Sequence, residues 1–164
     1  MEKPRLLKAS EMDVRIATIS EKGASLLIYK DARVDMDILD EWVGSMNWKR
    51  KHSRDNANCC VSIYDRIKNE WITKEDTGTE SFTEKEKGLA SDSFKRACFN
   101  WGIGRELYTA PFIWIKPLSE NEFYKNQSGK YSTNTKFVVD SVTYDNDRNI
   151  INLVIKDNKG NVRF

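Results

Sequence analysis

Residues 83–108, TEKEKGLASDSFKRACFNWGIGRELY, decide the fold because they predict the strongest helix of the chain. Thr83 and Glu86 have the spacing of a capping box, in which each side chain satisfies a backbone N–H at a helix start. Gly102 can take the left-handed conformation that ends a helix. Between them, apolar residues recur at helical spacing and form one stripe that predicts packing on a sheet. The stripe consists of Ala90, Phe94, Ala97, Cys98 and Trp101.

The other side of this helix is basic. Lys87, Ser91 and Lys95 follow at four-residue steps, and Arg96 lies beside them, four residues after Asp92. A solvated amphipathic face explains such a pattern in most helices. A phosphate-binding surface is the functional alternative.

Three strand-like segments precede the helix, at residues 48–54, 59–65 and 70–74. Short turns separate them, which favours an antiparallel meander. Before them, residues 31–44 predict another helix, with Asp31 at its start and Gly44 at its stop. Its carboxylates most simply form a solvated face, since no histidine or matching ligand set supports a metal site.

The two ends of the chain predict further β structure. Residues 1–20 indicate a short marginal element, residues 24–29 a strand or a turn, and residues 108–116 a bent strand. Residues 116–135 read as a polar loop, and residues 136–164 as a C-terminal β-hairpin extension. The predicted fold is therefore α+β: an antiparallel β-meander packed on a long helix (a β-β-β-α core) with an extra C-terminal β-hairpin.

Length and composition fit one domain over residues 1–164. The net charge of +2 is too small to imply a nucleic-acid partner, so any basic site must come from local clustering. Three cysteines, two of them adjacent, argue against a disulfide framework and favour a reducing, cytoplasmic setting. No segment has the length of a membrane span, and we expect no membrane partner.

Common catalytic patterns are absent from the sequence. It has no Walker A loop, no HExxH, no GxSxG and a single histidine, His52. Cys98 lies on the apolar stripe and is expected to be an inert buried thiol. We therefore predict a protein that is not an enzyme, with no catalytic residues, no metal site and no cofactor.

Basic residues gather within the predicted β-β-β-α unit. They could line a groove between sheet and helix that follows a phosphate backbone, while Tyr64 stacks on bases. That combination suits single-stranded nucleic acid. On the strand at 48–54, protection of a sheet edge by lysines is the alternative explanation. The candidate residues are Lys49, Arg50, Lys51, Lys74, Lys87, Lys95, Arg96 and Arg105.

The turn Gly102-Ile103-Gly104-Arg105 has two interpretations. Its backbone N–H groups could hold a phosphate oxygen. A plain helix cap is the simpler interpretation, because two glycines alone are a weak signal.

The sequence around the long helix resembles the Rad-fifty-two superfamily of single-strand annealing proteins, and most of all its short, Sak-like phage branch. The similarity covers residues 24–115, including the helix and glycine-tryptophan segment at 31–48. The matching residues are Glu75-Asp76-Thr77-Gly78, Lys87-Gly88, Ser91-Asp92, Phe94-Lys95-Arg96-Ala97 and the run from Trp101 to Tyr108.

The resemblance implies protomers joined into rings or helical filaments, with single-stranded DNA in a positive groove. The family's Lys–Arg pair, which lines its inner DNA site, falls on Lys95 and Arg96. Lys49, Arg50, Lys51 and Lys74 are inferred from the basic pattern alone. Some relatives have a further basic residue one helical turn after this pair, where this chain has Phe99 or Asn100. Glu106 stands where an aromatic residue is common in relatives.

The functional hypothesis is a phage protein that binds single-stranded DNA and anneals complementary strands without ATP in homologous recombination and DNA repair. It would act in the host cytoplasm, with a phage or host single-stranded DNA-binding protein as a partner. Two alternatives stay open at this point. One is a metal-dependent nuclease acting on DNA, and the other is a non-catalytic partner-binding module.

Overall fold

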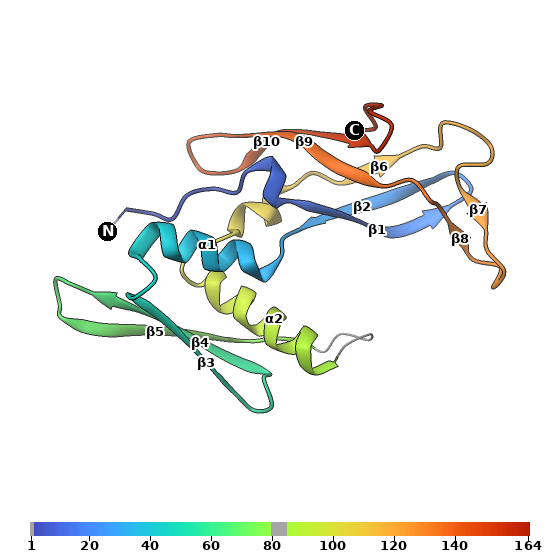
Figure 1. Cartoon of the computed structure of the whole chain (residues 1–164). Coiled ribbons are helices and arrows are strands. Elements are labelled where there is room, and N and C mark those ends of the chain that lie inside the picture. The colour runs from blue at the N-terminus through green and yellow to red at the C-terminus, as the bar shows by residue number, and fades with distance from the viewer. Residues whose placement is uncertain (1, 80–84) are drawn as a thin grey trace. The chain divides into compact units, whose positions relative to one another are not determined.

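The computed structural model describes residues 2–79 and 85–164, with the side chains of residues 85–87 left out, and has an α+β fold with antiparallel sheets (Figure 1). This confirms the predicted fold class. The internal contacts divide the chain into unit 1, Met1–Leu6 with Asp31–Arg105, and unit 2, Leu7–Lys30 with Glu106–Phe164. The range 24–115, which the resemblance predicts as the DNA-binding annealing core, cuts across this division, because residues 24–30 and 106–115 belong to unit 2.

Unit 1 begins with helix α1 (Ala32–Val43), as its capping signals predicted. The Asp31 carboxylate accepts a hydrogen bond from the backbone N–H of Arg33 at 2.8 Å, which satisfies a donor at the helix start. Gly44 ends the helix with a φ of +87°, a conformation that glycine adopts without strain.

The predicted meander is confirmed as the sheet β3 (Trp48–Ser53), β4 (Asn58–Asp65) and β5 (Glu70–Thr77), in that order and antiparallel. Strand β5 is longer than the predicted 70–74, because Asp76 and Thr77 also pair with β4. Three consecutive residues with positive φ, at 54–56, turn the chain between β3 and β4.

Helix α2 (Lys85–Phe99) packs on this sheet through the predicted stripe. Phe94 is fully buried and stacks on Trp48 with ring centroids 6.1 Å apart. Trp101 donates from its indole N–H to the backbone carbonyl of Val61 at 3.0 Å. The predicted capping box of Thr83 and Glu86 lies outside the described residues and side chains.

Unit 2 contains the sheet β1 (Asp13–Ser20), β2 (Gly23–Tyr29) and β6 (Ile113–Ile115), in that order, after a short 3-10 turn, η1 (Ala9–Glu11). Strand β1 was expected only as a marginal element. A register shift between Ile16 and Thr18 breaks its alternation, so the sequence lacks the period of a regular strand.

The C-terminal hairpin is confirmed as β9 (Phe137–Tyr144) and β10 (Ile150–Asp157). Its inward residues include Ile155, which is completely buried, and strand β9 contacts β1. The chain passes from unit 1 to unit 2 through the 3-10 turn η2 (Arg105–Thr109). Of the bent strand expected at 108–116, only β6 (Ile113–Ile115) therefore forms. The polar loop contains the two-residue strands β7 (Tyr124–Lys125) and β8 (Tyr131–Ser132).

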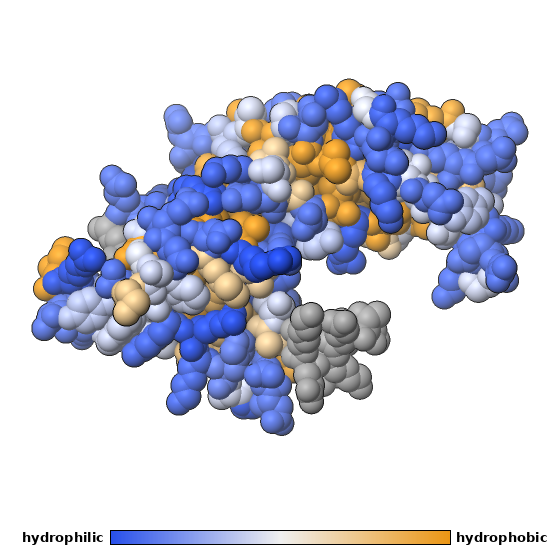
Figure 2. Space-filling model, in the orientation of Figure 1, coloured by the Kyte–Doolittle hydropathy of each residue, from blue (hydrophilic) through white to orange (hydrophobic). Residues whose placement is uncertain are grey.

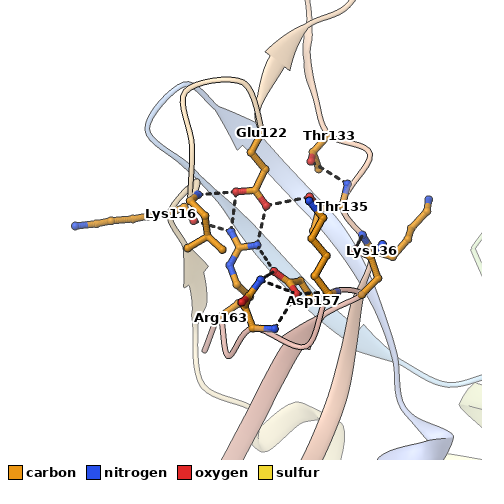
Figure 3. Close-up of polar contacts among 11 residues, drawn as sticks. Lys116, Glu122, Thr133, Thr135, Lys136, Asp157 and Arg163 are labelled. Atoms are coloured by element: carbon orange, nitrogen blue, oxygen red, sulfur yellow. Dashed lines mark hydrogen bonds and ion pairs between the residues drawn. The ribbon is translucent and has the colours of Figure 1, made fainter.

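A buried charge cluster anchors this loop (Figure 3). The side chain of Arg163 is only 1% exposed and donates to the Glu122 carboxylate at 2.7 and 3.0 Å, to Asp157 at 3.1 Å and to the carbonyl of Lys116 at 2.8 Å. Thr135 also donates to Glu122, at 2.9 Å. The cluster therefore joins the loop, the end of β10 and the C-terminal residues of unit 2.

Within residues 2–79 and 85–164, the structure has no helix with the length and apolar character needed to cross a membrane.

Candidate nucleic-acid interface

The sheet of unit 1 has two chemically different faces. Directly paired residues of an antiparallel sheet point to the same side. Arg50, Val61 and Lys74 are paired in register, and Val61 is buried, so this set lies on the side covered by α2. The residues between them point the other way. We call that side the outer sheet face; it comprises Lys49, Lys51, Cys60, Ser62, Tyr64, Trp71, Thr73 and Glu75.

The eight basic candidates consequently do not share one groove. Arg50 lies on the helix side, with its guanidinium carbon 4.8 Å from the centre of the Phe94 ring. Lys74 lies on the same side, 4.7 Å from the centre of the Trp101 ring. Its ammonium also donates to the backbone carbonyl of Asn100 at 2.8 Å. Both cations therefore take part in packing the sheet against α2.

Arg105 has a similar structural role at the end of α2. Ile103 N–H donates to the Cys98 carbonyl and Gly102 N–H to the Phe99 carbonyl, a pattern that closes a helix around a left-handed glycine. The Arg105 guanidinium also donates to the carbonyls of Phe99 and Asn100, two of the carbonyls at the end of the helix that have no i+4 backbone donor. This geometry confirms the helix-cap interpretation of the glycine turn.

Lys95 and Arg96 lie on α2 beside carboxylates. The Arg96 guanidinium contacts Asp92 at 3.0 Å, the i,i+4 pairing expected from the sequence. Burial acts to raise the pKa of Asp92, but the hydrogen bond from Thr79 N–H and the Arg96 guanidinium outweigh it and lower the pKa. Lys95 also stabilises the charged forms of Asp92 and Asp31. Part of this positive charge is thus balanced within unit 1. The side chain of Lys87 lies outside the description.

The outer sheet face combines cations with a pair of aromatic rings, of which Trp71 is exposed and Tyr64 half-buried. The Lys49 ammonium lies 4.1 Å from the centre of the Trp71 ring, and Trp71 is 40% exposed. Tyr64 meets Trp71 edge to face, with centroids 5.4 Å apart and planes at 61°. Lys51 is exposed two residues along β3 from Lys49. In an extended strand that spacing separates the two side chains by roughly 7 Å along the edge.

Neutral polar groups fill the middle of this face. The hydroxyls of Ser62 and Thr73 are hydrogen-bonded at 2.7 Å. The Cys60 thiol donates to the Glu75 carboxylate at 3.2 Å, and this hydrogen bond, together with burial, raises the pKa of the thiol. Cys60 is therefore a neutral thiol at physiological pH. Glu75 places a negative charge at one end of the face, away from Trp71.

Trp71 is the residue that sequence reasoning overlooked. Tyr64 was named as a stacking candidate, whereas Trp71 was treated only as part of a strand. Period-two alternation across the short turn pairs Trp71 with Tyr64, and that register places both rings on the outer sheet face. The alternation of both strands was visible in the sequence, but only the register of the β4–β5 hairpin shows that Trp71 and Tyr64 are neighbours.

No family model, curated protein or solved structure matches this chain. In the described part of the chain, no group of three or more His, Cys, Asp or Glu side chains has the geometry to hold a metal ion.

Proposed function

We propose that this protein binds single-stranded DNA on the outer sheet face and anneals complementary strands without nucleotide hydrolysis. The observation that supports this is the exposed ring of Trp71 with the half-buried ring of Tyr64 beside it, accompanied by Lys49 and Lys51 on the same side of the sheet. The sequence resemblance to single-strand annealing proteins favours the same activity.

The chemistry of the face fits a flexible strand with its bases unpaired. Lysines along the edge strand β3 neutralise phosphates, and each neutralised phosphate releases counterions. Rings on β4 and β5 contact bases through their π-faces, which is independent of base identity. Stacking occupies the flat face of a base and leaves its hydrogen-bonding edge exposed, so a second strand can pair with it.

Oligomerisation into a ring or filament, as the resemblance implies, would repeat this face along one strand of DNA. The protein would then act in homologous recombination and DNA repair. The Lys95–Arg96 surface of α2, the inner site that the resemblance implies, would supply a further phosphate contact. Because the charge of Arg96 is paired with Asp92, we expect this surface to contribute less to DNA binding than the outer sheet face does.

The test replaces Lys49 and Lys51 together with alanine. Single-stranded DNA shows a slope of log affinity against log salt of about −0.7 for each phosphate contact, so the slope should become shallower by about 1.4. Trp71→Ala should weaken binding roughly 5- to 150-fold, since stacking contributes about 1–3 kcal/mol per base. Fluorescence anisotropy with labelled oligothymidylate measures both, and annealing of complementary oligonucleotides without ATP measures the activity.

The matched control replaces Lys130 and Lys136, two exposed lysines of unit 2, with alanine. This variant loses the same net charge and should retain the affinity and the salt slope. If the Lys49/Lys51 variant binds and anneals like the control, the outer sheet face does not bind DNA.

A further inference from the structure

The sheet β1–β2–β6 of unit 2 also has one side turned away from its core. Leu26 and Ile113, which are paired, are buried, whereas the neighbouring pair of Ser25 and Trp114 lies on the opposite side. Leu27 and Tyr29 follow Ser25 at two-residue steps, and Arg15 pairs with Leu27. Hydrophobic residues are visible at several places on the surface of the molecule (Figure 2), and the exposed ones on this side of the sheet include Leu27 and Phe112. We call this side the aromatic face; it comprises Arg15, Leu27, Tyr29, Phe112, Trp114 and Lys116.

Trp114 packs closely against Gly23. A Cβ atom on Gly23 would come within 2.4 Å of the indole ring, so the ring covers the position where any larger residue would place its side chain. Part of the indole is thus packed against the backbone. Trp114 is nevertheless 40% exposed. The sheet therefore holds the indole in place while part of it stays exposed to solvent.

Phe112 is stacked beside Trp114 and is 77% exposed. The ring centroids are 6.4 Å apart and the planes differ by only 18°. At this exposure Phe112 contributes little to the core of unit 2. Because Phe112 is so exposed, the stacked pair leaves part of the Phe112 ring open to solvent, where a planar ligand can extend the stack.

Cations accompany the rings. Lys116 continues the alternation of Phe112 and Trp114, and its side chain points away from the buried charge cluster (Figure 3). Arg15 is exposed on β1. Neither forms an ion pair with another described residue. The carboxylate of this face, Asp13, is paired with Tyr29 at the end remote from β6.

We propose that the aromatic face of unit 2 is a nucleobase-stacking site for single-stranded nucleic acid. Phe112 and Trp114 stack on bases, and Lys116 and Arg15 contact the adjoining phosphates. A purely apolar protein partner would use the rings and leave the two cations unmatched. The site has the same ligand class as the outer sheet face, but it rests on the residues of unit 2 alone.

The experiment is photo-crosslinking of the full-length protein to oligothymidylate that contains 5-bromouracil, with the crosslinked residue identified by mass spectrometry. Crosslinks at Phe112 or Trp114 are expected. In parallel, Phe112→Ala should weaken binding of this oligonucleotide at least fivefold. Because Phe112 is so exposed, this variant should fold normally. Val138→Ala, another exposed apolar position of unit 2, is the matched control and should bind like wild type.

The outcomes separate this proposal from the previous one. Crosslinks confined to Tyr64 and Trp71, with unchanged affinity of the Phe112→Ala variant, would overturn the site on unit 2 and leave the outer sheet face intact. Crosslinks confined to Phe112 or Trp114 would support the site on unit 2 and overturn the outer sheet face as a DNA-binding surface. If Phe112→Ala lowers the native mass of the protein but not its affinity for the oligonucleotide, the aromatic face is a contact between copies of the chain, and the proposal is wrong.

Discussion

Replacing Arg163 with alanine should destabilise unit 2 strongly. The substitution removes a guanidinium that is 1% exposed and leaves the carboxylates of Glu122 and Asp157 buried without their cation. Breaking a buried ion pair in this way costs about 3–5 kcal/mol. Glu122 keeps hydrogen bonds from Leu118 and Thr135, which places the cost near the lower end. For a chain of this size, about 3 kcal/mol lowers the melting temperature by roughly 6–12 °C.

Thermal unfolding followed by circular dichroism measures this shift. Arg163→Lys keeps the positive charge but loses the two-pronged contact with Glu122, so its melting temperature should fall between those of wild type and Arg163→Ala. The control is Lys156→Ala, which removes a half-exposed ion pair with Asp140 and should cost under about 1 kcal/mol. If Arg163→Ala melts within about 2 °C of that control, the cluster is not a determinant of stability and the reasoning fails.

Two further predictions concern charge. The hydrogen bonds from Asn161 lower the pKa of Asp157 to about 2, and those from Arg163 outweigh burial and lower the pKa of Glu122. Carboxyls with lowered pKa values stabilise the fold above their unfolded values, so the melting temperature should be level near neutral pH and fall between about pH 4 and pH 2; a level profile to pH 2 would contradict this. Replacing Lys95 and Arg96 together with alanine should change the melting temperature little, since an i,i+4 pair contributes about 0.3–0.5 kcal/mol. This variant should weaken binding of single-stranded DNA less than the Lys49/Lys51 variant does, and anisotropy showing the opposite order would place the main contact on α2.

The sequence was most informative where local signals agreed. Helix α1 begins after Asp31 and ends at Gly44, as its caps indicated. The middle of the apolar stripe of α2, at Phe94, Ala97 and Cys98, is buried, and the hairpin of β9 and β10 forms where alternation predicted it. The caps and the hairpin reflect contacts between neighbours in sequence, and the stripe reflects the period of the helix itself, so a local pattern reports all three.

The rest depended on register and on distant partners. Strand β1 was underestimated because its bulge interrupts the alternation. Lys49 and Arg50 are adjacent in sequence but lie on opposite faces of the sheet. The run of basic residues therefore predicted a larger basic surface than either face has. Lys74 and Arg105 looked like ligand contacts, yet both donate to carbonyls at the end of α2. The partner of Lys74 is 26 residues away, so its neighbours in sequence give no sign of this contact.

The interleaving of the two units has a consequence for how the chain folds. Ala24 of β2 pairs with Ile115 of β6, and the whole segment Asp31–Arg105 is synthesised between them. Closing a flexible loop of that length costs about 4 kcal/mol in chain entropy. If unit 1 folds first, its own structure fixes the separation of residues 31 and 105 and removes most of that cost. We therefore expect unit 1 to fold early and the central sheet of unit 2 to form only after residue 115 has left the ribosome.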